Sequence, residues 1–273
     1  MRPDTHPGSL MARIGNSALL VYAVLVLAFL MLPLAIIVPM SFSDQPYLTF
    51  PPSGWTWHWY EEVRNQPRWL TAAWNSVRIG VPVALLSVVF GTLAALAVTR
   101  SGSGWSKPFS LLVLAPMMLP HVIIAIGLYP TIVSLGLAGS YLAIVIGHTV
   151  VGIPFVFVTV SAALKNYPPT LDMAARTLGA NGWKTFLRVT LPMTWPGIAS
   201  GGLLAFATSF DELMLALFLT GIRTETLPRI IWDQLSFALT PTIAAAATLI
   251  LLLTTLLLGI ASLLGARRSR KGE

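Results

Sequence analysis

The sequence predicts an all-α polytopic membrane protein with six transmembrane helices. Of its 273 residues, 55% are hydrophobic and only 10% are charged, and the mean hydropathy is +0.77. A soluble globular domain carries about 25% charged residues, so this chain lacks the polar surface of a water-soluble globule, and lipid must solvate it. Each span uses about 20 apolar residues, and the little chain left over excludes a large soluble catalytic domain.

Six apolar runs are each long enough to cross the hydrocarbon core of a membrane. They lie at residues 18–40, 71–99, 109–129, 141–163, 194–220 and 242–264. The first run is longer than the 7–15 residues or so of a signal-peptide core, and no small-residue cleavage pattern follows it. We therefore expect an uncleaved first helix, an N-terminal tail at 1–16, a membrane domain at 17–264 and a basic tail at 265–273.

The basic residues predict the orientation of the spans. Six spans put both termini on one side, which then holds twelve of the seventeen Lys and Arg residues. The twelve are Arg2, Arg13, Arg100, Lys107, Lys165, Arg176, Lys184, Arg188, Arg267, Arg268, Arg270 and Lys271, and the five on the other side are Arg64, Arg68, Arg78, Arg223 and Arg229. Since basic residues are retained in the cytoplasm, we expect both termini there. The net charge of +7 then reports topology rather than nucleic-acid binding.

The first outer loop, from Ser41 to Leu70, is rich in aromatic residues. They are Trp55, Trp57, Trp59, Tyr60 and Trp69, with Trp74 just beyond the loop. Tryptophan and tyrosine prefer the headgroup region, so we expect this segment to lie along the outer interface. Contact with a ligand or partner is the alternative that the composition leaves open.

One long inner loop, residues 164–192, separates the fourth and fifth spans. Pro168-Pro169 ends the preceding helix, and Thr170 is a suitable N-cap for a new one. Apolar residues then recur at helical spacing on one face, at Leu171, Ala174, Ala175 and Leu178. Gly179 ends this helix, and Gly182 opens a second short helical segment.

The first helix of this loop has small residues at the centre of its apolar face. Ala174 and Ala175 let another surface approach the backbone closely, which favours docking of a separate soluble subunit. An amphipathic helix lying on the inner leaflet is the equal alternative. Asp172 and Arg176 lie four residues apart on another face, with the acid nearer the N-terminus as the helix dipole prefers.

These residues carry a resemblance to a known family. Met173-Ala174-Ala175, three residues, Gly179, nine residues and Val189-Thr190-Leu191-Pro192 resemble the coupling-loop signature of permease subunits in binding-protein-dependent ABC importers. That signature reads Glu-Ala-Ala, three residues, Gly, nine residues, Ile-x-Leu-Pro. The resemblance runs from the first span to Leu264 and is greatest to the spermidine/putrescine type. Other similar stretches are Leu119-Pro120, Ser209-Phe210-Asp211-Glu212 and Thr226-Leu227-Pro228.

The resemblance implies a transport subunit of the cell inner membrane that is not itself an enzyme and binds no cofactor. ATP would be used by a partner ATPase, present in two copies. The other implied partners are a second homologous permease subunit, an extracytoplasmic substrate-binding protein and membrane lipid, with no nucleic acid. The implied ATPase-coupling residues are Asp172, Met173, Ala174, Ala175, Gly179, Leu191 and Pro192.

The chain departs from the family pattern at two positions. Met173 replaces the glutamate of the signature, so the reciprocal side-chain cap to Thr170 is missing, although Asp172 still complements the helix dipole. Polyamine-type relatives often have an acidic residue after the proline of the third span, whereas this chain has His121. The second difference weakens the argument for a polycationic substrate.

Asp211 and Glu212 are adjacent acids within the fifth predicted span. At about 1.5 Å per residue from Met193, they lie more than halfway across the membrane, where ionisable groups are costly unless they face water, a partner or a substrate. We expect them, with His121, at the substrate pathway or at a gate. Lining the pathway, they would attract a cation such as a protonated amine. His121 and His148 have no carboxylate or second histidine at ligand spacing, which favours hydrogen bonding or packing.

The remaining motifs indicate neither nucleotide binding nor catalysis by this chain. Residues 179–185 lack the Gly-Lys pair and glycine spacing of a phosphate loop, and the sequence contains no HExxH, GxSxG or plausible catalytic triad. Gly197 and Gly201 predict close helix packing, which fits association with a second subunit. Importers of other small solutes, such as amino-acid derivatives or phosphonate-like compounds, remain open. A secondary transporter or channel and a membrane-embedded enzyme are the alternatives from other classes.

Overall fold

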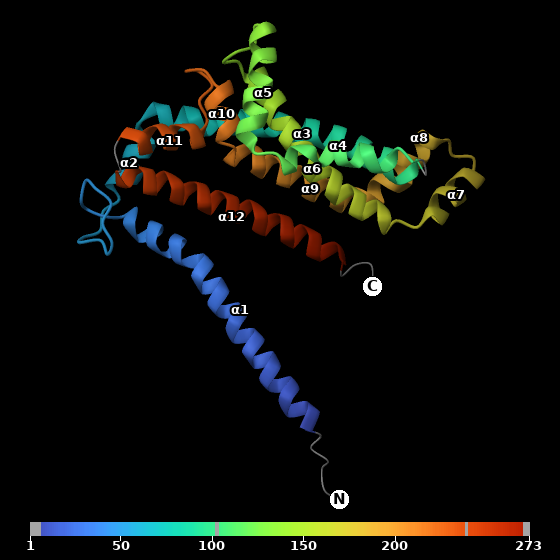
Figure 1. Ribbon diagram of the computed structural model, residues 1–273, viewed down its shortest axis with the longest axis horizontal. Coiled ribbons are helices and arrows are strands. Elements are labelled where there is room, and N and C mark those ends of the chain that lie inside the picture. The colour runs from blue at the N-terminus through green and yellow to red at the C-terminus, as the bar shows by residue number, and fades with distance from the viewer. Residues whose placement is uncertain (1–6, 102–103, 238–239, 270–273) are drawn as a thin grey trace, which may run out of the picture. The chain divides into compact units, whose positions relative to one another are not determined.

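The computed structural model describes residues 7–101, 104–237 and 240–269, and their regular structure is helical (Figure 1). This confirms the predicted all-α class over those ranges. The elements are α1 (Pro7–Met40), α2 (His58–Asn65), α3 (Pro67–Arg100), α4 (Ser106–Met118), α5 (His121–Ser134), α6 (Tyr141–Lys165), α7 (Pro169–Thr177), α8 (Gly182–Thr185), the π-helix η1 (Phe186–Thr190), α9 (Leu191–Asp211), α10 (Met214–Leu219), α11 (Leu227–Phe237) and α12 (Pro241–Ser269).

Three described helices are long and apolar enough to cross a membrane: α1 over Ser17–Met40, α3 and α6. A fourth crossing is reached when α4 and α5 count as one span, but these two helices are bent by 102° at their junction. The span predicted over 109–129 therefore corresponds to this bent pair of helices and not to one straight helix. Leu119 takes an extended conformation, which the following Pro120 favours because proline disfavours the helical conformation in the residue before it.

The predicted span over 194–220 is also interrupted. α9 ends at Asp211, Glu212 is extended with φ −75° and ψ 112°, and α10 begins at Met214. The interruption is stable because the Glu212 side chain accepts a hydrogen bond from the Leu215 backbone N–H at 3.1 Å, which satisfies a free donor of α10. α12 has an apolar stretch over Pro241–Leu256, so six crossings remain a prediction.

The described chain forms two compact groups. The first holds residues 7–63 and 240–249, with α1 and the aromatic loop that follows it. Trp59 Nε1 donates to the Ser43 carbonyl at 2.6 Å, and Ser41 and Tyr60 share a hydroxyl hydrogen bond at 2.6 Å. Trp55 and Trp57 are exposed. Exposed indoles on a folded loop agree with either an interfacial or a partner-binding role.

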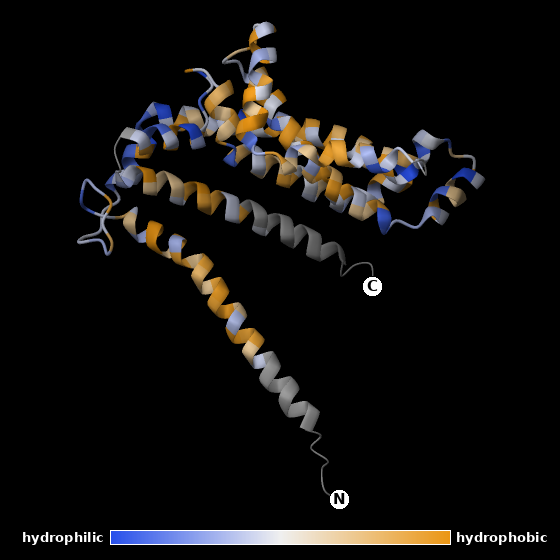
Figure 2. Ribbon diagram, in the orientation of Figure 1, coloured by the Kyte–Doolittle hydropathy of each residue, from blue (hydrophilic) through white to orange (hydrophobic). Residues whose placement is uncertain are grey.

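The second group holds residues 64–237 and 250–269. α3, α6 and α9 run side by side through it (Figure 1). Their contacts bury a cluster of mostly small and branched apolar side chains. It comprises Ala94, Ala95, Val156, Phe157, Val160, Leu164, Ile198 and Ala205. Hydrophobic residues predominate in the middle of these helices, and hydrophilic residues are more frequent at α7 and α8 (Figure 2).

Gly197 and Gly201 bring α9 against α6. A Cβ atom at position 197 would lie 2.7 Å from Ala163 Cβ, and one at position 201 would lie 2.9 Å from Val156 Cα. The predicted close helix packing is confirmed, and the helix that uses it belongs to this chain rather than to a second subunit.

We expect Gly201→Ala to destabilise the protein by about 1–3 kcal/mol, because the added methyl group meets the α6 backbone and overpacks the interface. Gly127→Ala is the matched control, since a Cβ there meets nothing within 4 Å and alanine favours the helix. Thermal unfolding of the purified protein in detergent measures both. Equal unfolding temperatures for the two variants would contradict this account of α6–α9 packing.

Candidate functional site

Ion pairs mark the two ends of α3 in the second group. At the C-terminal end of α3, Arg100 contacts Asp172 of α7. At its N-terminal end, Arg68 contacts Glu225 and Asp233. The coupling loop, residues 164–192, thus lies at one end of α3, and the segment leading into α11 lies at the other.

The first helix of the coupling loop starts earlier than predicted. α7 begins at Pro169, its N-cap position is Pro168, and no side-chain cap is made. Thr170 is therefore not the N-cap, and that prediction was wrong. Proline suits the first helical position because its fixed φ matches the helix and its missing N–H needs no acceptor there.

Gly179 ends α7 as the sequence predicts. Its φ is +81°, in the left-handed region that favours glycine. The Gly179 N–H donates to the Arg176 carbonyl at 2.9 Å and the Ala180 N–H to the Ala175 carbonyl at 3.0 Å, which is a Schellman C-cap. Gly182 opens α8, where the Asn181 side chain accepts from the Lys184 N–H at 2.8 Å. The predicted second helical segment is confirmed.

The apolar residues of the coupling loop remain largely open. Leu178 is 89% exposed, and Met173, Ala174 and Trp183 are also exposed. Leu171 and Ala175 are only half-buried, as is Leu191 at the start of α9, while Pro192 is exposed. None of the nine residues of α7 is buried within this chain. The surface is thus available to a partner, as an exposed apolar patch commonly is.

Asp172 points toward the helix bundle and not toward Arg176. Its carboxylate lies 2.8 Å from Arg100 Nη2, accepts the Tyr167 hydroxyl at 2.6 Å and lies 3.3 Å from Thr190 Oγ1. Arg100 also donates to Thr190 Oγ1 at 3.0 Å. Burial raises the pKa of the Tyr167 phenol and its hydrogen bond to Asp172 raises that pKa further, so the hydroxyl remains a donor at neutral pH.

Glu212 and His121 form a close pair, so the interpretation of His121 as isolated was wrong. His121 Nδ1 lies 2.5 Å from Glu212 Oε2, and the pair joins the start of α5 to the α9–α10 break. Glu212 is 6% exposed. Asp211, by contrast, is exposed, and within the described chain its carboxylate has no hydrogen-bond or ion-pair partner. The two adjacent acids therefore have different environments.

His148 is a buried, hydrogen-bonded histidine, as the sequence favoured. It lies in α6, is 1% exposed, and its Nδ1 is 2.9 Å from Ser209 Oγ of α9. Within the described residues its Nε2 has no partner, and no group of three or more His, Asp or Glu side chains is placed to hold a metal ion.

Three polar residues that the sequence analysis did not select hold the segment around α10 and α11. Arg229 Nη1 donates to the Thr220 carbonyl at 3.0 Å and to the Ala216 carbonyl at 3.3 Å, capping the C-terminus of α10. Asn75 Nδ2 donates to the Arg223 and Glu225 carbonyls at 3.1 and 2.9 Å. Arg68 binds Glu225 through two hydrogen bonds of 3.0 Å. In the sequence, the only signal for these residues is that they lie near the ends of predicted spans.

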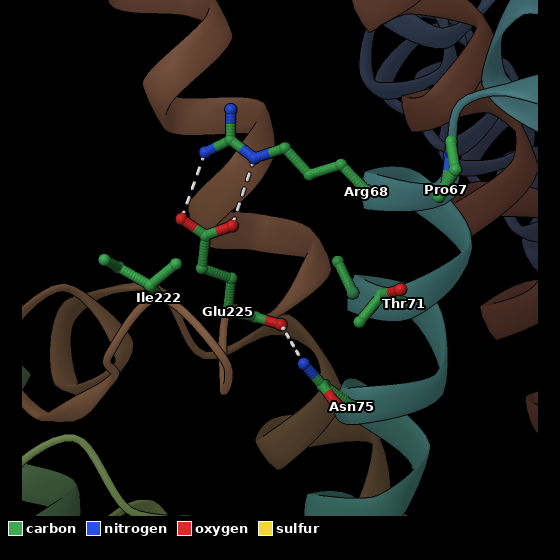
Figure 3. Close-up of a pocket in the computed structure, with 7 residues that line it drawn as sticks. Pro67, Arg68, Thr71, Asn75, Ile222 and Glu225 are labelled. Atoms are coloured by element: carbon green, nitrogen blue, oxygen red, sulfur yellow. Dashed lines mark hydrogen bonds and ion pairs between the residues drawn. The ribbon is translucent and has the colours of Figure 1, made fainter.

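A pocket of about 350 Å³ opens beside this ion pair (Figure 3). Its lining comes from the start of α3 and from the segment before α11, namely Pro67, Arg68, Thr71, Ala72, Asn75, Ile222 and Glu225. Ile222 is 93% exposed at its rim. The Arg68–Glu225 pair closes one side of the pocket, and the hydrogen bond from Asn75 fixes the Glu225 backbone (Figure 3).

Comparison with known proteins extends the resemblance seen in the sequence. Residues 87–270 match the family described as binding-protein-dependent transport system inner membrane components. The spermidine/putrescine transport system permease protein PotC of Escherichia coli K12 is 32% identical over 248 residues, covering 90% of this chain and 92% of PotC. The putrescine transport system permease protein PotI of the same strain is 33% identical over 230 residues, covering 82% of each chain.

A solved structure has the same fold. A chain of a bacterial alginate ABC transporter, crystallised with an alginate pentasaccharide-bound periplasmic protein, superposes with a TM-score of 0.71 at 18% identity. The match covers 93% of this chain and 94% of that chain. At this identity the likeness concerns the fold alone.

Proposed function

The chain belongs to the family of binding-protein-dependent transport system inner membrane components and is a permease subunit of an ABC importer, and from this premise we propose how its parts act. The observation that carries the proposal is the coupling loop. It presents an exposed short helix that is ended by a left-handed glycine and anchored to the bundle by its one acid.

In the proposed topology the chain crosses the inner membrane six times. α1, α3, α6 and α12 cross as single helices, while α4–α5 and α9–α10 each cross as an interrupted pair. An interruption inside a membrane is tolerated where protein surrounds it, and Glu212 and Arg229 supply the hydrogen bonds at the second one. The twelve-to-five distribution of basic residues supports cytoplasmic termini and a cytoplasmic coupling loop.

The proposed partners follow from the exposed surface of the coupling loop and from the lack of nucleotide-binding and catalytic motifs in the sequence. Met173, Ala174 and Leu178 would contact an ABC ATPase, which hydrolyses ATP in two copies, one for each permease subunit. A second homologous permease subunit would complete the pathway. An extracytoplasmic binding protein would deliver the solute at the other end of α3, near Ile222.

Import would proceed by alternating access. Closure of the ATPase dimer on ATP would move α7 and α8, and the attached helices would rock from an inward-facing to an outward-facing arrangement. The chain itself would form no covalent bond with the solute. Its contribution would be to bind the ATPase, to line the pathway and to hold the two interrupted helix pairs together.

The proposed solute is a small polyamine-like cation. PotC and PotI, which are named for spermidine and putrescine transport, support this class. The structure distinguishes the two candidate acids, because the carboxylate of Glu212 is used by His121 and by the Leu215 N–H, whereas that of Asp211 is exposed. Asp211 would therefore meet the protonated amine, and Glu212 with His121 would hold the gate region in shape.

We expect Gly179→Asp to abolish uptake while the protein stays in the membrane. The φ of +81° strains any residue with a Cβ, and a charged side chain would obstruct the close approach of the ATPase. Co-purification of the ATPase with the permease measures the loss directly. Gly182→Ala is compared with Gly179→Ala as a matched pair, since both add a methyl group to open space and only position 179 has a positive φ.

The outcomes of that experiment separate the classes of function. An importer permease should retain its ATPase in the Gly182→Ala variant and lose much of it in Gly179→Asp. Unchanged uptake and unchanged ATPase recovery in Gly179→Asp would contradict the coupling assignment. Uptake without any ATPase would favour a secondary transporter.

We expect Asp211→Asn to lower uptake of a cationic solute at least about tenfold, because a hydrogen bond to a charged group contributes about 1.5–3 kcal/mol. Glu212→Gln is expected to act mainly on thermal stability. The amide oxygen still accepts from the Leu215 N–H, but the negative charge that faces His121 is lost. Uptake of labelled polyamine at a saturating concentration of the binding protein measures both. A larger uptake defect in Glu212→Gln would reverse the two assignments.

A further inference from the structure

Four side chains from four segments meet where α7 joins the bundle. They are Arg100 at the end of α3, Tyr167 after α6, Asp172 in α7 and Thr190 at the end of η1. Asp172 is the centre, with partners at 2.6, 2.8 and 3.3 Å, and Arg100 and Thr190 are joined to each other at 3.0 Å. We call these four residues the anchor network.

Apolar packing within this chain gives α7 little support. None of its nine residues is buried, and Leu178, which follows it, is 89% exposed. An isolated helix of nine residues is also unstable in water. The anchor network is thus the main polar connection of α7 to the bundle within the described residues.

The anchor network connects α7 to all three central helices. Arg100 is the last residue of α3, and Thr190 runs directly into α9, where its carbonyl accepts the Thr194 hydroxyl at 2.8 Å. Since Tyr167 follows α6, the carboxylate of Asp172 is within hydrogen-bond reach of groups attached to α3, α6 and α9. Any displacement of Asp172 therefore acts on all three helices at once.

Asp172 and the neighbouring Met173 face in different directions. Adjacent helical residues point about 100° apart, and here Met173 is exposed while Asp172 faces the bundle. The Asp172 carboxylate can therefore bind groups of the bundle, whereas the exposed position 173 carries no carboxylate.

We propose that Asp172 is a positioning residue that fixes α7 rigidly to the bundle, so that movement imposed on α7 passes to α3, α6 and α9 instead of bending the loop. This inference rests on the proposed function, because the movement would come from the ATPase. The Asp172–Arg100 pair is the essential connection, and Tyr167 and Thr190 orient it.

The test uses Asp172→Asn, Arg100→Gln and the double variant. Lys165→Gln is the control, because it removes the same charge as Arg100→Gln from the end of a neighbouring helix, and Lys165 has no ion-pair partner among the described residues. The first measurement is amide hydrogen exchange over residues 169–181 in the purified permease, which needs no ATPase. The second is the amount of solute imported per ATP hydrolysed by the complete importer in proteoliposomes.

We expect exchange over 169–181 to rise at least about fivefold in both single variants and to stay unchanged in Lys165→Gln. Solute imported per ATP should fall at least about fivefold in the same variants, while the ATPase still co-purifies. The double variant should be no worse than either single variant, since each removes the same connection.

Two results would overturn the proposal. One is unchanged exchange in Asp172→Asn, which would show that α7 is held by other contacts. The other is additive loss of import per ATP in the double variant, which would show that Asp172 and Arg100 act separately. If the wild-type chain retains no ATPase, the proposed function fails instead, and the exchange measurement still decides whether the anchor network holds α7.

Discussion

The structure depends on one constraint: a helix that is interrupted in apolar surroundings must have its free backbone groups satisfied by side chains. The α9–α10 break meets it at both ends of α10. Glu212 accepts from the Leu215 N–H, and Arg229 donates to the Ala216 and Thr220 carbonyls. His121 then pairs with Glu212 and connects this break to the one before α5. Charged residues are few in this chain, and Glu212 and Arg229 are two of them that hold an interruption.

Three of the buried or half-buried acids in the described chain hold particular elements in place. Asp172 attaches the coupling loop, Glu212 stabilises the α10 break, and Glu225 with Arg68 closes the pocket at the far end of α3. Asp211, in contrast, is exposed at the end of α9. This difference in environment is the basis of the proposal that Asp211, rather than Glu212, meets a cationic solute.

The sequence predicted features that depend on local physics. The glycine at 179 and the second helix opening at Gly182 follow from helix-end rules, and both are observed. Apolar content alone does not distinguish a continuous span from an interrupted one, so it did not locate the breaks at Leu119 and Glu212. The His121–Glu212 pair is 91 residues apart in sequence, and no spacing rule of a single chain connects such residues.

The central claim is that the two ends of α3 lie on opposite sides of the membrane, with the coupling loop inside. Because the chain contains no cysteine, single cysteines at Leu178 and Ile222, both highly exposed, test it directly with a membrane-impermeant thiol reagent on spheroplasts. The account predicts labelling of Ile222→Cys in sealed spheroplasts and labelling of Leu178→Cys only after the membrane is opened. Labelling of Leu178→Cys in sealed spheroplasts would contradict it.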